Sequence, residues 1–435
     1  MVFCGRIHLF WIKYFRKIGG YFMNFLRKND GITLITILLI MVIILILVFG
    51  IVYISNKKSQ STQLSDTTNG NIGNTDGSWN GTVDAPKLVA GMTAVGWDSY
   101  NNEIAPTTQN DWYNYMVQPG TTDNGGTSKW ANAKTSNGSY LVWIPRYEYK
   151  ITDGLHGYVG TSGTGTFLPA GAAGTIDVKF IPVTQTTADN GYKIHPAFTN
   201  SGNGGFGELS GIWVGKYASS NDGSGNVKII SNVVPWINIT VNDVFNTCRT
   251  FSTNNSLAGM DSHMMKNTEW GAVAYLTQSQ YGRNGTEVTI NNYYVGGTPK
   301  TGYAGDFASE FIDTTGSNSY PYNTTQGVLA STTGNITGVY DMSGGVWEYV
   351  AAYVNNGDSS LNSHCLSLIN AATKYKDVYT VGNTDSQANN YAAASSKYGD
   401  ALYETSFISG LVDGGWFEES SLFPYATEPI FIRRR

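Results

Sequence analysis

The feature that most constrains this chain is a long apolar run near its N-terminus. Residues 32–54 read ITLITILLIMVIILILVFGIVYI, 23 residues without a charged side chain. At a rise of about 1.5 Å per residue, a helix of this length crosses the hydrocarbon core of a bilayer. We therefore predict one N-terminal transmembrane helix, with the rest of the chain folded separately from it.

Charge gives the orientation of this predicted helix. Six Lys or Arg residues and Asp30 give the first 30 residues a net charge of +5, whereas the whole chain has a net charge of −5. Basic residues stay on the cytoplasmic side of a membrane segment. Residues 1–31 are therefore predicted to be a cytoplasmic leader of a single-pass cell-membrane protein whose body is extracellular. That acidic body has no basic stripe, so we predict no nucleic-acid partner.

The junction between leader and apolar run, KNDGITLI at residues 28–35, resembles the leader of type IV prepilins. This resemblance implies peptidase cleavage between Gly31 and Ile32. Thr36 stands where that family usually has a glutamate associated with pilus assembly, which favours cleavage over incorporation into a fibre. Met23 begins a leader of ordinary length, so translation starting there is an alternative.

Two further segments precede the main body. Residues 55–82 are rich in Ser, Thr, Asn, Gly and Asp. Because they can bury too little apolar surface to offset the conformational entropy lost on ordering, we predict that they form a flexible stalk. Residues 83–138 are predicted to be an aromatic-rich extension of short strands, because Trp97, Trp112 and Trp130 lie between turn-forming residues. We expect these aromatics to be buried against the following domain, with a glycan platform as the alternative.

Residues 334–350, GNITGVYDMSGGVWEYV, are the most informative stretch of the body. Gly344 and Gly345 lie between the carboxylates of Asp341 and Glu348. Glycine adopts backbone angles that other residues avoid, and large aromatics beside such a turn are normally buried. The residues alone therefore favour a turn within the core.

This stretch resembles the block G-(L/V)-Y-D-M-(A/S)-G-N-V-W-E-W-(V/T) of formylglycine-generating-enzyme-like, or sulfatase-modifying-factor, domains. Three upstream blocks occur in that family's order, at residues 212–217, 235–248 and 266–270. The resemblance covers residues 139–435 and implies an α+β fold of the C-type lectin-like class with many irregular loops. Non-enzymatic ligand-binding proteins also use this fold. The motif residues are Asp341, Gly344, Gly345, Trp347, Glu348, Glu269 and Trp270.

Periodicity predicts individual elements within the body. Apolar residues at helical spacing predict helices over residues 240–252, capped by Thr240, and over residues 267–276, capped by Asn267 or Thr268. β-Branched and aromatic runs predict strands, and the proline near the end of the first run fits an edge strand or an opening strand. These strands are predicted at residues 140–147, 180–183 and 212–217.

The resemblance implies an oxidase chemistry for which we find no catalytic residues. Formylglycine-generating enzymes oxidise a substrate cysteine with reactive cysteines and copper. Here Cys248 lies in a predicted helix and Cys365 in a polar insertion, so neither matches the catalytic context. A disulfide between these two cysteines is the alternative to two free thiols.

Calcium is the other cofactor that the resemblance implies, with Glu348 as candidate ligand. Gly345 replaces the asparagine of the family block, so the site has one side-chain oxygen fewer for a calcium ion, which binds six to eight oxygen ligands. Calcium is therefore an open alternative, and no cofactor is firmly predicted. For Glu269, Asp341 and Glu348 we favour hydrogen bonding to loop amides.

These observations predict a membrane-anchored, surface-exposed and non-catalytic lectin-like domain that binds an extracellular protein or glycan or mediates adhesion. A formylglycine-generating-type oxidase acting on exported proteins and a minor pilin-like subunit are the alternatives. Residues 416–433 resemble a late family block, after which relatives continue into further strands. We therefore expect a C-terminally truncated domain in which the backbone of Leu141–Tyr147 lacks partners.

Overall fold

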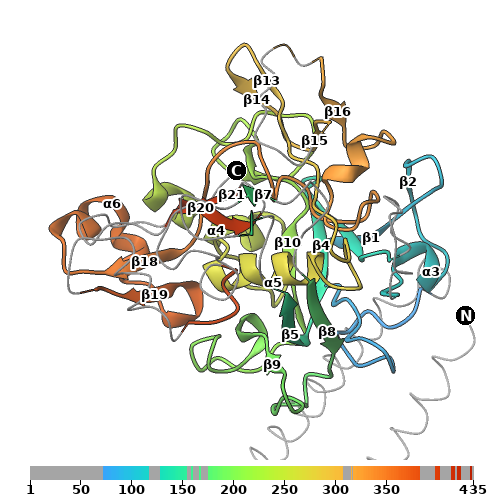
Figure 1. Cartoon of the computed structure of the whole chain (residues 1–435), viewed down its shortest axis with the longest axis horizontal. Helices are drawn as coiled ribbons and strands as arrows, with labels where there is room; N and C mark the ends of the chain where they lie inside the picture. The colour runs from blue at the N-terminus through green and yellow to red at the C-terminus, as the bar shows by residue number, and fades with distance from the viewer. Residues whose placement is uncertain are drawn as a thin grey trace, which may run out of the picture. The chain divides into compact units, whose positions relative to one another are not determined.

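The computed structural model of this chain places a folded domain after the N-terminal region (Figure 1). It describes residues 72–116, 128–153, 158–159, 166–167, 175–306, 315, 317–382, 397–401, 413–416, 419–422 and 432–433. The leader, the apolar run and the stalk up to residue 71 lie outside these residues. Within the described part of the chain, no helix is both long and apolar enough to cross a membrane.

The main sheet has five antiparallel strands in the order β10-β4-β3-β1-β2. Their bounds are β1 (Met92–Trp97), β2 (Glu103–Ile104), β3 (Asn132–Thr135), β4 (Tyr140–Pro145) and β10 (Gly211–Gly215). Residues 83–138 thus supply three strands of the same sheet as β4, and they form part of one folded unit with it. Trp112 and Trp130 are fully buried, as predicted, and Trp97 is nearly so.

The prediction that Leu141–Tyr147 lie at an uncovered edge is wrong. β4 is an inner strand, because β3 pairs with one side and β10 with the other. Tyr147 begins β5 (Tyr147–Asp153), which lies between β8 (Thr175–Phe180) and β9 (Lys193–Ile194). The partners come from segments before and within the body, so the backbone is satisfied without further C-terminal strands.

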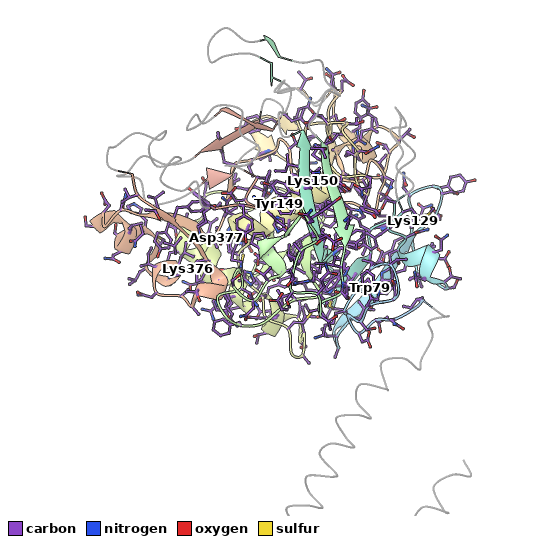
Figure 2. The ribbon with its side chains drawn as sticks, turned by 60° about the horizontal axis from the view of Figure 1, so that its bottom comes forward. Trp79, Lys129, Tyr149, Lys150, Lys376 and Asp377 are labelled. Atoms are coloured by element: carbon purple, nitrogen blue, oxygen red, sulfur yellow. The ribbon has the colours of Figure 1, made fainter. Side chains whose placement is uncertain are left out.

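The predicted stalk is too long by its last eleven residues, 72–82. Residues 75–88 form a β-hairpin, the N-terminal hairpin, closed by hydrogen bonds from Ala85 N to Ser78 O and from Leu88 N to Thr75 O, each 2.9 Å. Ile72 and Val83 are buried in a cluster with Trp112, Tyr113 and Trp143. These two apolar side chains supply the contacts that the polar composition concealed. Trp79, in the same hairpin, is partly exposed (Figure 2).

Two helices agree with the sequence and two were not predicted. α4 (Val241–Asn254) begins after Thr240, whose hydroxyl accepts a hydrogen bond from Asp243 N as predicted for the cap. α5 (Asn267–Thr277) also forms, but its cap residue is Lys266 rather than Asn267 or Thr268. The unpredicted helices are α3 (Gln109–Trp112) and α6 (Ser359–Ile369).

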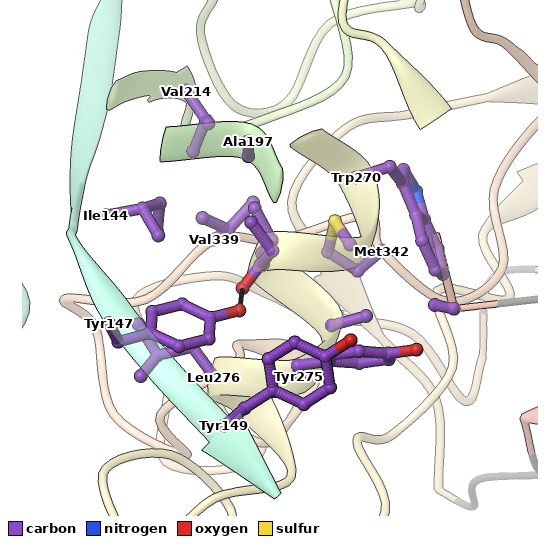
Figure 3. Close-up of a cluster of buried hydrophobic side chains, with 14 of the residues drawn as sticks. Ile144, Tyr147, Tyr149, Ala197, Val214, Trp270, Tyr275, Leu276, Val339 and Met342 are labelled. Carbon is purple, nitrogen blue, oxygen red and sulfur yellow. Dashed lines mark hydrogen bonds between the residues drawn. The ribbon is translucent and has the colours of Figure 1, made fainter. Parts of the chain in front are cut away.

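The largest core cluster lies between α5 and the strands β4, β5 and β8, and includes residues of the 334–350 stretch. Tyr147, Tyr149 and Tyr275 pack together there, and the hydroxyl of Tyr147 donates to Ala272 O at 2.7 Å (Figure 3). Full burial of a large apolar side chain stabilises by about 1.5–3 kcal/mol. α5 is buried along its whole length, so this cluster fixes the helix against the sheet.

The remaining elements are short and joined by irregular loops, which makes this a mixed α/β fold with few helices. β18 (Ala352–Asn355) and β19 (Asp377–Thr380) form a parallel pair, and the other short pairs are antiparallel. The antiparallel elements are β6 (Tyr158–Val159), β7 (Thr166–Phe167), β11 (Ser220–Asn221), β12 (Val227–Lys228), β13 (Tyr294–Val295), β14 (Thr298–Pro299), β15 (Tyr303–Ala304), β16 (Tyr320–Pro321), β17 (Glu348–Tyr349), β20 (Asp413–Trp416), β21 (Glu419–Leu422) and β22 (Ile432–Arg433). The described residues also include the 3-10 helices η2 (Pro196–Phe198), η3 (Gly327–Ala330) and η4 (Thr373–Tyr375).

Candidate functional site

Asp341 joins three loops through its buried carboxylate. Its oxygens accept hydrogen bonds from Gly302 N (2.9 Å), Ala218 N (3.0 Å) and Asn291 Nδ2 (2.8 Å). Burial raises the pKa of this carboxyl group, and the three hydrogen bonds oppose that rise. The favoured hypothesis for Asp341, hydrogen bonding to loop amides, is therefore confirmed.

The two glycines of the turn meet different surroundings. Gly344 has a φ of +82° and lies against Asn291, so that a Cβ atom would come within 2.3 Å of Asn291 O. Gly345 has a φ of +71°, yet the nearest atom to its Cβ position is Asn291 Nδ2 at 3.7 Å. Both conformations favour glycine, but only at Gly344 does close packing exclude a side chain. Position 345 has room for a Cβ atom.

Glu269 organises the start of α5. Its Oε2 accepts a hydrogen bond from Lys266 N at 2.8 Å, and its Oε1 lies 2.9 Å from His263 Nε2 and 3.6 Å from Lys266 Nζ. Burial by itself raises the pKa of this carboxyl group, but the charges of His263 and Lys266 outweigh it and lower the pKa to about 2. Glu269 thus accepts a backbone amide hydrogen bond, as we expected, and also pairs with His263 and Lys266, which we did not predict.

The N-terminus of α5 has a second acidic partner. Asp377 of β19, labelled in Figure 2, accepts hydrogen bonds from Thr268 N (2.8 Å) and Thr268 Oγ1 (3.0 Å). Carboxylates stabilise a helix N-terminus by accepting its unpaired N–H groups. Sequence spacing gave no sign of this partner, because Asp377 lies 109 residues further along the chain.

The two tryptophans of the motif differ in their environment. Trp270 is buried in the main core, as predicted. Trp347 is 46 % exposed, so the expectation that the aromatics beside the glycine turn are buried is wrong for this residue. Tyr340, before the turn, is buried. Gly344 and Gly345 both have positive φ, and the chain returns to the main core at Val350.

Glu348 lies in β17, directly opposite Arg433 of β22 in the antiparallel register. It is partly exposed. Among the described residues, no three His, Cys, Asp or Glu side chains are grouped so that they could hold a metal ion.

Cys248 and Cys365 are free thiols in the contact between α4 and α6. Cys365 is fully buried on α6, which corrects its assignment to a polar insertion. Burial raises the pKa of Cys248 to about 12 and that of Cys365 to about 11. A reactive thiol needs an electropositive and accessible setting. Cys365 is inaccessible, and Cys248, although partly exposed, has a raised rather than a lowered pKa.

Exposed apolar side chains occur on or near the segments that Asp341 joins, and the sequence did not predict them. We call this set the loop surface. Its members are between 39 % and 46 % exposed, and they are Val234, Ile237, Tyr294, Trp347 and Tyr349. Hydropathy alone does not distinguish such residues from core residues, because exposure depends on where the loops lie.

The loops that carry these side chains are connected by backbone hydrogen bonds. Asn232 N donates to Thr301 O at 2.8 Å and Thr301 N donates to Val233 O at 2.9 Å. Asn291 and Gly344 form a parallel bridge. Tyr294 lies three residues after Asn291, and Trp347 lies three residues after Gly344. The loop surface is therefore held by a buried polar network.

No protein-family model matches this chain, and no curated protein matches it significantly.

Proposed function

We propose that this chain is a membrane-anchored, surface-exposed domain of the C-type lectin-like, formylglycine-generating-enzyme-like class that binds an extracellular protein or glycan without catalysis. The anchor is supported by the uncharged run at residues 32–54 and the basic leader before it. The class is supported by the four ordered sequence blocks and by a mixed α/β fold with long irregular loops.

The observation that carries a binding role is the loop surface. Trp and Tyr side chains contribute strongly to binding because they offer a large contact area with few rotatable bonds. Here Tyr294 and Trp347 are exposed on segments that the backbone bridge between Asn291 and Gly344 joins, and Tyr349 is exposed on β17. Pre-organised loops lose less conformational entropy on binding.

The buried thiols favour binding over the oxidase alternative. An oxidase of the formylglycine-generating type requires thiolates that copper and a substrate cysteine can reach. Cys365 has no exposed surface, and the pKa of Cys248 is raised by burial to about 12. Tight copper binding, or conversion of a sulfatase-type cysteine peptide by the purified protein, would instead support the oxidase.

A binding screen with matched variants tests the proposal. The purified chain is first applied to arrays of glycans and of extracellular proteins, and the affinity of each hit is measured. Trp347→Ala and Tyr294→Ala are each expected to weaken a genuine ligand about tenfold or more, as for central interface aromatics. Tyr100→Ala, which removes a more exposed tyrosine from a different loop, should leave the affinity unchanged. Equal effects of all three variants would contradict this assignment of the surface.

A further inference from the structure

The N-terminal hairpin is held on the main sheet by two neighbouring tryptophans. Trp143 Nε1 donates to Asp84 O at 3.1 Å, and Trp213 Nε1 donates to Lys87 O at 2.8 Å. The two indole rings lie 5.3 Å apart, on paired positions of β4 and β10. The hairpin is thus fixed through its backbone, at the point where the chain enters the described domain.

The side chain of Asp84 is buried in this contact without a hydrogen-bonding partner. Its relative exposure is 0 %, and neither Oδ1 nor Oδ2 makes a hydrogen bond. The backbone amide of Val183 is near enough to lower the pKa slightly, but it does not meet the geometry of a full hydrogen bond. A buried carboxylate without partners is strongly destabilised relative to its neutral form.

The charged group that acts on Asp84 from the sheet is Arg146, between β4 and β5. Arg146 is buried, and its Nη2 atom lies 2.7 Å from Glu208 Oε2. Its Nη1 and Nη2 atoms also donate to backbone oxygens, while its Nε has no partner. Because Glu208 already neutralises the guanidinium, little of its charge is left to stabilise an ionised Asp84.

The hairpin itself carries two other charged side chains. Asp76 and Lys87 are paired across the hairpin by a backbone bridge, and Asp76 is exposed. The pKa of Asp76 is lowered, mainly by a hydrogen bond with Ser78. Asp76 is therefore ionised at neutral pH and provides a matched control for Asp84 on the same element.

We infer that Asp84 is a proton-dependent latch, which keeps the N-terminal hairpin seated on β4 and β10 while its carboxyl group is neutral and weakens that seat when it ionises. Burial raises the pKa of Asp84 from 3.8 to about 7. Because the pKa is raised, the neutral carboxyl group stabilises the seated hairpin. This stabilisation is complete below the ordinary pKa of 3.8 and is lost as the pH rises from there to about 7. The latch involves only the described domain, so it does not depend on the proposed binding function.

Hydrogen exchange on the full-length chain in detergent tests this latch. The amides of Ala85 and Leu88, which close the hairpin, are followed between about pH 5 and about pH 9, after correction for intrinsic exchange. Because the pKa of Asp84 differs this much between the seated and the open hairpin, the equilibrium constant for hairpin opening should rise on the order of tenfold to a hundredfold across that range. Peptides from α5 should show no corresponding step.

Two variants assign the step to its residue. Asp84→Asn keeps the shape but cannot ionise, so its hairpin should remain protected at every pH. Asp76→Asn should keep the pH-dependent step of the natural sequence. The latch is refuted by flat protection in the unmodified chain, by a step that persists in Asp84→Asn, or by an equal step in α5. The first and third outcomes need no variant, so the test holds even if Asp84→Asn folds poorly.

Discussion

Asn291 and Gly344 hold each other through the backbone. Asn291 N donates to Ser343 O at 2.9 Å, and Gly345 N donates back to Asn291 O at 2.6 Å. The side chain of Asn291 also donates to Asp341 Oδ1 at 2.8 Å. One residue therefore joins the glycine turn to the carboxylate that connects the neighbouring loops.

This contact predicts different tolerance at the two glycines. Gly344→Ala would bring a Cβ atom against Asn291 O and keep a positive φ, and we expect a loss of stability of about 3 kcal/mol or more. At Gly345 the nearest atom to an added Cβ is Asn291 Nδ2, at an ordinary contact distance of 3.7 Å. Asparagine tolerates the left-handed region, so we expect Gly345→Asn to change the stability by at most about 1 kcal/mol. Urea unfolding of both variants measures the difference, and equal losses would contradict the role of Asn291.

Glu269 predicts a loss of stability in acid. Burial raises the pKa of its carboxyl group, but His263 and Lys266 outweigh burial and lower the pKa to about 2. A lowered pKa means that the ionised carboxylate stabilises the fold above its ordinary pKa of 4.5. That contribution is lost as the pH falls from about 4.5 to about 2, and it amounts to about 3 kcal/mol at most.

Matched variants isolate this carboxylate. Glu269→Gln should destabilise the domain at neutral pH and show a weaker decline of unfolding free energy in acid. Glu103→Gln, which disrupts a partly exposed pair with Lys134, should change stability by less than about 1 kcal/mol. Identical acid profiles for Glu269→Gln and the unmodified chain would show that Glu269 does not carry this dependence.

The two described thiols should be unreactive in the native domain. Burial raises both pKa values, so little thiolate is present at neutral pH, and the nucleophilic form is the thiolate. We expect iodoacetamide to modify Cys248 and Cys365 only after denaturation, as measured by mass spectrometry. Rapid native alkylation, or an intact disulfide between them, would contradict this assignment.

The N-terminal predictions are tested on cells. Protease treatment of intact cells should digest the body of a single-pass protein whose N-terminus is cytoplasmic, because basic residues precede the apolar run. Resistance in intact cells followed by digestion after lysis would reverse the topology. Mass spectrometry of the mature N-terminus separately decides cleavage between Gly31 and Ile32, and an intact leader would reject the prepilin hypothesis.

Local sequence was sufficient for the features that depend on neighbouring residues. Short-range stereochemistry accounts for the cap of α4, the periodicity of α4 and α5, the strand at residues 212–217 and the presence of glycines in the turn at residues 344–345. The buried tryptophans of residues 83–138 were also predictable, since several large aromatics between turns have few other stable locations. The exact cap of α5 was missed, because Glu269 reaches back to Lys266.

Contacts between distant segments decided the rest. The inner position of β4 requires β3 and β10 on its two sides, and no local pattern encodes that pairing. Likewise, Asp84 resembles any hairpin aspartate until Trp143 and Trp213 bury it, and Trp347 resembles a core residue until the turn exposes it. Burial is a property of the assembled chain, and it changes both the pKa of a carboxyl group and the role of an aromatic ring.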